Sequence, residues 1–287
     1  MKSRVNPARS IVLLGPRSQM RPSVGCGGQD PMIRLSLVLI ITACGTTVSA
    51  AQWLNYPAAG IPRLPDGKPN LSAPAPRTAD GKPDLSGIWF IDQTPEGEFG
   101  ERPLALRSEV KPEDIVLTPE GEALQRQRSR NPLAGAQCSP VGIPALAAAQ
   151  PFKIISSTGV IVILYELETT FRQIFMDGRP LPVDPNPAFR GYSVGKWDGD
   201  TLVVDTTGFN DRGGIIGRPH SDALHIVERF RRRDFGHLEI EYTVVDPRIY
   251  AKPFTIKQRQ HLTPDTELLE YICNENEKDL KHMVGGK

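Results

Sequence analysis

The sequence predicts an all-β protein, an antiparallel up-and-down β-barrel of about 8–10 strands with one short helix. Apolar and polar residues alternate over many short runs from residue 86 onward, which is the two-residue period of strands. Tight turns join most runs to the next, and parallel pairing would need long crossovers, so neighbouring strands should be antiparallel. Such a meander tends to close on itself and remove its edges, which favours the barrel over the alternative, a two-sheet β-sandwich.

Residues 1–50 are expected to be a leader. Residues 1–31 show no periodicity, and Met32 is a second candidate start. A short basic segment ending at Arg34 precedes the apolar run LSLVLIITAC, which has the length of a signal-peptide core and is too short to span a bilayer. The signal peptide would therefore cover about residues 32–50, and we expect an exported, periplasmic protein.

Two cleavage sites are open. Val48-Ser49-Ala50 before Ala51 is a small-residue cleavage site that would release a soluble product, and it is favoured because it lies at a natural distance from the apolar run. Ile41-Thr42-Ala43-Cys44 instead matches a bacterial lipobox, which would leave a lipid anchor on Cys44. Such an anchor is the only membrane attachment that the sequence predicts.

Charge argues against a nucleic-acid partner. The first 43 residues hold six of the 34 basic residues and one of the 33 acidic ones, which leaves 28 and 32, and a charge of −4, for the remainder. A mildly acidic body gives no electrostatic basis for binding nucleic acid. The basic run 231–233 is followed at once by Asp234, as expected of the solvated end of a hairpin.

Two of the four cysteines fall in the body of the chain. Cys138 and Cys273 are predicted to form one disulfide, because an exported protein folds in an oxidising compartment. Two free thiols and a metal site are the alternatives. Neither cysteine has a second ligand at metal-binding spacing, so no metal is predicted.

The rest of the chain divides into a strap, residues 51–85, and one barrel domain, residues 86–287. The strap is rich in Pro and Gly and contains DGKPNLS at 66–72 and DGKPDLS at 80–86, each typical of a turn. Thr118 and Pro119 have the residue types that begin a helix. The expected strands are 86–92, 152–156, 160–166, 171–176, 192–197, 201–206, 223–231, 237–245, 254–261 and 267–273.

The segment Asp84-Leu85-Ser86-Gly87-Ile88-Trp89 resembles the Gly-x-Trp opening strand of lipocalin-like (calycin) barrels. This resemblance implies a cup that holds a small apolar molecule, with a Trp closing its floor, and it implies no catalytic residues. DGKPDLSGIW, MDGRPLP, GYSVGKWDGDTLVVDTTGFND and PHSDALHIVERF are more broadly similar to a set of exported bacterial proteins of uncharacterised activity, over about residues 80–275.

Strand alternation suggests which side chains face the interior. Glu228 shares a strand face with apolar residues that include Phe230, while His225 and Arg229 share the other face. A carboxylate among apolar residues is costly unless it is paired or protonated. Glu228 is therefore either a cavity acid or base, or a residue near the mouth that pairs with a cross-strand arginine. Tyr192, Phe230 and Tyr242 could line a cavity or pack as core.

The loops carry the denser polar content. Arg179 and Asp211 lie in two of them, and His220, Asp222 and His225 follow in a His-x-Asp-x-x-His pattern. That spacing matches no established zinc signature. Asp222 could orient His220 as a base, or Asp222 and Ser221 could simply cap a turn, which is the favoured interpretation.

Two functions remain, and neither needs a cofactor. The first is a barrel that binds a small, largely apolar or aromatic molecule, with Arg179, Asp211, His220 and Asp222 at its mouth. The alternative is a cofactor-free isomerase, lyase or cyclase, in which Glu228 or His220 moves a proton while Arg179 or Arg229 holds an anionic group. A purely structural protein would have a filled barrel. Serine-nucleophile and phosphate-loop motifs are absent, and the oligomeric state is not predicted.

Overall fold

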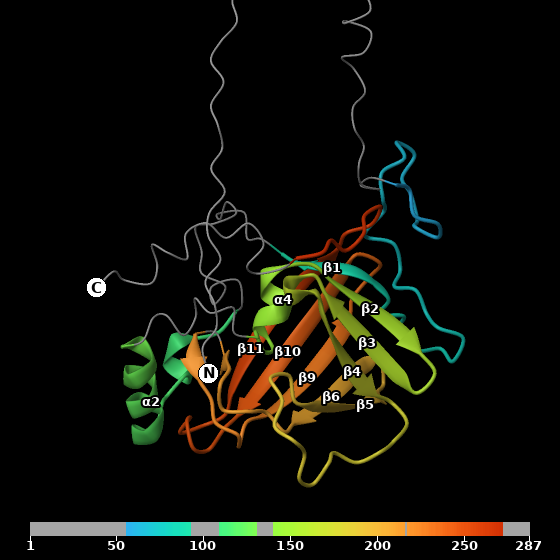
Figure 1. The fold of residues 1–287 in the computed structure, drawn as a ribbon. Helices are drawn as coiled ribbons and strands as arrows, with labels where there is room; N and C mark the ends of the chain where they lie inside the picture. The colour runs from blue at the N-terminus through green and yellow to red at the C-terminus, as the bar shows by residue number, and fades with distance from the viewer. Residues whose placement is uncertain (1–55, 93–108, 131–139, 216, 272–287) are drawn as a thin grey trace, which may run out of the picture. The chain divides into compact units, whose positions relative to one another are not determined.

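The computed structural model describes residues 56–92, 109–130, 140–215 and 217–271. Within them nine strands close into a barrel in the order β1-β11-β10-β9-β6-β5-β4-β3-β2, and β7 and β8 pair separately (Figure 1). The strands are β1 (Gly87–Ile91), β2 (Phe152–Ser157), β3 (Val160–Tyr165), β4 (Thr170–Phe175), β5 (Tyr192–Asp198), β6 (Thr201–Thr207), β7 (Gly214–Ile215), β8 (Arg218–Pro219), β9 (His225–Arg232), β10 (His237–Val245) and β11 (Phe254–Leu262).

The barrel follows chain order, and one pair departs from the predicted antiparallel pattern. β4 and β5 are parallel, in register at Ile174↔Ser193 and Phe175↔Val194. Alternating strand directions cannot close around an odd number of strands, so a nine-stranded barrel needs at least one parallel pair. The connection between Phe175 and Tyr192 is long enough for the crossover that parallel pairing requires. The strand predicted from residue 267 does not form over 267–271.

Two α-helices accompany the barrel in the described ranges. α2 (Pro119–Ser129) begins as predicted: the Thr118 hydroxyl oxygen accepts the Gly121 N–H at 3.0 Å, and Pro119 occupies the first turn. α4 (Ala145–Ala149) was not predicted. Single 3₁₀ turns lie at η2 (Pro112–Asp114) and η3 (Leu167–Thr169). No helix in the described ranges is both long and apolar enough to cross a membrane.

The predicted alternation holds on the central strands. On β9 and β10 alternate residues are buried, and the apolar ones among them belong to one core with buried residues of β1, β2, β3, β4, β6 and β11. At one end Trp89 is fully buried, donates its indole N–H to the Leu85 carbonyl at 2.9 Å, and lies 4.9 Å from the Arg232 guanidinium. Trp89 and Arg232 therefore pack together at that end of the barrel.

α4 packs against the inward-facing side of β11. Gln258 and Gln260 are both buried, and their amide groups each donate to a main-chain carbonyl at 3.2 Å, Gln258 to Pro144 and Gln260 to Ala147. Leu146 and Ala147 join the core. Side chains of α4 and β11 therefore fill the part of the barrel interior next to α4, where the sequence predicted a cavity.

The two DGKP segments of the strap fold in the same way. In each copy an arginine faces a proline across an isolated β-bridge and donates to the glycine carbonyl of the turn. The arginine then pairs with an aspartate of a distant loop. These contacts are Arg63 with Asp265 and Arg77 with Asp200, so each copy fastens the strap to a different loop of the barrel domain.

Several predictions fall outside the described residues. They concern the leader at 1–50 and the cysteines at 26, 44, 138 and 273, so export, lipid attachment and the disulfide stay predictions.

Candidate functional site

A pocket of about 370 Å³ lies between α2 and the segments that precede β9 and follow β10. It brings together three residues that the sequence placed at a mouth: Asp211, His220 and Asp222. Apolar groups and further polar groups complete its wall. The remaining lining residues are Glu120, Ala123, Leu124, Gln127, Ser221, Arg248 and Ile249.

α2 is fixed against the barrel at both ends, which gives this pocket a defined wall. At its start the Thr118 N–H donates to the Ile249 carbonyl at 2.9 Å. A Cβ at Gly121 would lie 2.3 Å from that same oxygen, so only glycine allows the helix to approach this closely. At its end Arg128 donates to the main-chain oxygens of Asp211, at 2.6 Å, and Gly213.

His220 is the titratable group of the pocket with the most distinctive surroundings. It is 3% exposed, and its ring meets Phe209 edge-on at 6.1 Å between centroids. Burial lowers the pKa of His220, which favours the neutral ring. Its Nδ1 lies 3.0 Å from the Ser221 carbonyl oxygen, which can only accept, so Nδ1 carries the proton and Nε2 keeps a lone pair.

The neighbouring Ser221 and Asp222 have structural contacts. Ser221 donates both its hydroxyl, at 2.8 Å, and its main-chain N–H, at 2.6 Å, to the buried Asp246 carboxylate. The exposed Arg248 pairs at 2.7 Å with Asp222 and also with Glu120, which links the rim to α2. Asp222 thus pairs with Arg248, while the His220 ring bonds the Ser221 carbonyl.

Three other predicted site residues lie away from this pocket. Arg179 pairs with Asp177 and stacks 3.9 Å from the Phe175 ring centroid. Tyr192 donates its hydroxyl to the Asn186 carbonyl at 2.9 Å. His225 contacts the Asp205 carboxylate. His225 therefore lies away from His220 and Asp222, and the described part of the chain holds no group of three His, Cys, Asp or Glu placed to bind a metal.

Glu228 faces the interior, as its strand pattern predicts, and it is paired with an arginine, as one of the two interpretations expected. It is 1% exposed and pairs through both carboxylate oxygens with Arg172, one contact being 2.9 Å. Arg172 lies on β4, and β5 and β6 separate it from β9 in the sheet, so the pair spans the lumen. Burial alone would lower the pKa of Arg172, but the Glu228 charge and hydrogen bonds outweigh it and raise the pKa.

Arg172 is the interior residue that the sequence analysis missed. It shares its strand face with Ile174, which is fully buried, whereas Phe171 on the other face is 61% exposed. The Arg172 side chain also donates to the hydroxyls of Ser193 and Thr206 at 2.8–3.0 Å. The alternation of Arg172 with the apolar Ile174 indicated an inward-facing residue. The aromatic residues on the opposite face of the strand made that face look like the interior one.

The remaining lumen polar groups connect to this pair or to α4. Tyr242 and Phe230, predicted as cavity-lining or core, are both buried. Tyr242 donates to the Gln258 carbonyl oxygen at 3.2 Å. Burial raises the pKa of Tyr242 and raises that of Tyr165 to about 12, so both stay protonated at neutral pH.

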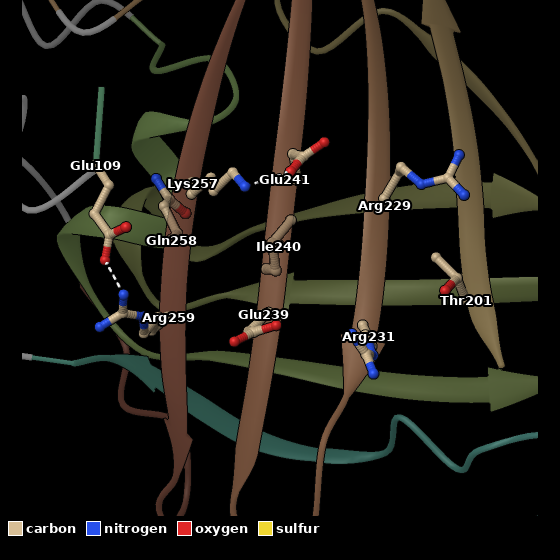
Figure 2. Close-up of a pocket in the computed structure, with 10 residues that line it drawn as sticks. All are labelled: Glu109, Thr201, Arg229, Arg231, Glu239, Ile240, Glu241, Lys257, Gln258 and Arg259. Atoms are coloured by element: carbon tan, nitrogen blue, oxygen red, sulfur yellow. Dashed lines mark ion pairs between the residues drawn. The ribbon is translucent and has the colours of Figure 1, made fainter. Parts of the chain in front are cut away.

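A second pocket, of about 440 Å³, lies on the outer face of β9, β10 and β11 (Figure 2). Cations and anions alternate across the strands there. Lys257 pairs with Glu241 at 3.0 Å and Arg259 pairs with Glu109 at 2.6 Å, as the dashed lines show. Exposed pairs of this kind contribute little stability, about 0–1 kcal/mol each.

His220 should make stability depend on pH. Its pKa is lower in the folded protein, so as pH falls the unfolded chain takes up a proton first. The contribution of a neutral His220 is complete above the unfolded pKa, about 6.5, and is lost as pH falls below it, at no more than about 1.4 kcal/mol per pH unit. We expect the free energy of unfolding, measured by urea denaturation between pH 7 and 5, to fall less steeply with decreasing pH for His220→Gln than for the wild type. An equal pH dependence in the two proteins would contradict this.

No protein-family model matches this chain, and no curated protein matches it either.

Proposed function

We propose that this barrel protein binds a small, largely apolar or aromatic molecule in the pocket between α2 and the barrel mouth. The observation that carries the proposal is the convergence of Asp211, His220 and Asp222 on one pocket that also exposes Ala123 and Leu124. Small-molecule sites combine apolar walls with a few polar groups that fix orientation. Placing the ligand here also leaves the packed lumen undisturbed.

The geometry supports binding better than the alternative, proton-transfer catalysis. That alternative needs an acid, a base and a cation converging on one pocket. His220 and Arg248 line the pocket, but Arg248 is already paired with Glu120 and Asp222, and Glu228 lies elsewhere, held by Arg172.

Filling the pocket should abolish binding. Ala123 lines the pocket on the exposed side of α2, so Ala123→Trp adds bulk to the pocket without touching the core. We expect the affinity for N-phenyl-1-naphthylamine, a neutral aromatic probe that fluoresces when bound, to fall at least about tenfold, since binding needs room for the rings. Fluorescence titration measures this.

Glu122→Trp is the matched control. Glu122 is the preceding, exposed residue of the same helix, does not line the pocket, and has only a surface pair with Arg126 at 3.3 Å. This variant should bind as the wild type does. Equal affinities for all three proteins would place the probe elsewhere and refute the proposed site, and absence of saturable binding by the wild type would count against the function.

A further inference from the structure

A third pocket, of about 580 Å³, is open between the second strap copy and the β9–β10 hairpin. Its lining is strongly basic, with four arginines and a single acid. Two prolines and an alanine form the rest of its wall. The lining residues are Pro74, Ala75, Arg77, Pro83, Asp200, Arg231, Arg232 and Arg233.

Two of the four arginines are neutralised by carboxylates. Arg77 pairs with Asp200 at 2.5 Å across the gap between the strap and the β5–β6 turn. Arg233 pairs with Glu239 at 2.8 Å within its own hairpin. Glu239 lies directly opposite Arg231 across the β9–β10 pair. Its carboxylate pairs with Arg233 instead, so it forms no ion pair with Arg231.

The other two arginines form no ion pair with a carboxylate in the described ranges, although Asp84 and Asp234 lie close enough to Arg232 to act on its charge. Arg231 is exposed and forms no ion pair or hydrogen bond with any described residue. Arg232 is buried, and its acceptors are the main-chain carbonyls of residues 84, 86, 234 and 235. Burial lowers the pKa of Arg232 to about 10, which still leaves it charged at neutral pH.

We propose that this pocket binds the phosphate group of a small molecule, with Arg231 as the principal contact. A guanidinium group fits phosphate oxygens with paired, charge-assisted hydrogen bonds. The pocket offers Arg231 for this contact, and Arg232 adds a second positive charge behind it that is bound only to main-chain carbonyls. This site is separate from the one proposed at α2, since the two pockets share no lining residue.

Isothermal titration of the full protein with inorganic pyrophosphate at low salt tests the site. Arg231→Gln removes the charge of an exposed strand residue and should weaken binding about fivefold to tenfold, the expected effect of losing one charge-assisted contact. Arg231→Lys keeps the charge but loses the paired geometry, so its affinity for pyrophosphate should lie between those of the wild type and Arg231→Gln. Added salt should weaken binding to the wild type.

Arg229→Gln is the control. Arg229 lies two residues earlier on the outer face of the same strand, is paired with Asp198 at 3.0 Å, and does not line this pocket. It should leave pyrophosphate affinity within twofold of the wild type. Equal losses in the Arg229 and Arg231 variants would show nonspecific attraction to the outer face and refute the site.

The source of the phosphate is decided by a second arm of the same experiment. Phosphatidylcholine vesicles with and without phosphatidylglycerol are sedimented with the wild type and with Arg231→Gln. Arg231-dependent binding only to the anionic vesicles would identify a lipid headgroup, whereas binding of pyrophosphate alone would identify a soluble phosphate. Failure of both arms overturns the proposal.

Discussion

Replacing Glu228 by alanine is expected to lower the free energy of unfolding by about 3–5 kcal/mol, because it leaves a charged arginine buried without its partner. Arg172 is only 4% exposed, and Ser193 and Thr206 can offer it hydroxyl oxygens but no negative charge. Urea denaturation at neutral pH, followed by circular dichroism, measures the change.

A double variant separates the loss of the pair from the loss of volume. Arg172→Met with Glu228→Leu removes both charges and keeps apolar bulk, so it should be much more stable than the Glu228→Ala single variant. Glu122→Ala, which removes an exposed pair, should change stability by less than about 1 kcal/mol. The expectation is wrong if the double variant is as unstable as the single one.

The sequence predicted the hairpin half of the barrel well because the signals there are local. The strand predicted at 237–245 has the observed bounds, and alternation on β9 correctly turned Glu228 and Phe230 inward. A tight turn also joins β5 and β6, as expected for the predicted strands 192–197 and 201–206. Where a short turn fixes register, a two-residue period is enough to assign the faces.

The sequence failed where the structure depends on closure. The parallel β4–β5 pair follows from the parity of nine strands, which no local pattern encodes. α4 is a short alanine-rich turn whose placement depends on Gln258 and Gln260, more than 100 residues away. Arg172 finds Glu228 across the barrel, again at long sequence separation.

The candidate site was also predicted only in part, because only one of its two walls comes from a single stretch of the sequence. Asp211, His220 and Asp222 belong to one connected stretch, so their common location could be expected from the loops alone. The opposite wall is α2, which is brought there by Thr118 and by Gly121 packing on Ile249. That contact joins segments about 130 residues apart in the sequence. No local pattern in either segment predicts it.

The contacts of Trp89 give the Gly-x-Trp segment a structural role. The second strap copy leads directly into β1, and its Leu85 is buried and accepts the Trp89 indole N–H at 2.9 Å. Arg232 covers the indole face and donates to main-chain oxygens on both sides of Leu85. The strap, β1 and the end of β9 are therefore coupled through one side chain.

Trp89→Ala is accordingly expected to destabilise the protein by about 3–5 kcal/mol, the usual cost of removing a large aromatic side chain from a core. The loss includes the hydrogen bond to Leu85 and the contact with Arg232, so Trp89→Phe, which keeps the ring contact but not the bond, should cost less. Trp197→Ala is the comparison variant, because Trp197 is only partly buried at the edge of the core and its loss should be smaller. Chemical denaturation of the three variants ranks them, and a Trp197→Ala loss that equals or exceeds that of Trp89→Ala would show that Trp89 does not anchor this end of the barrel.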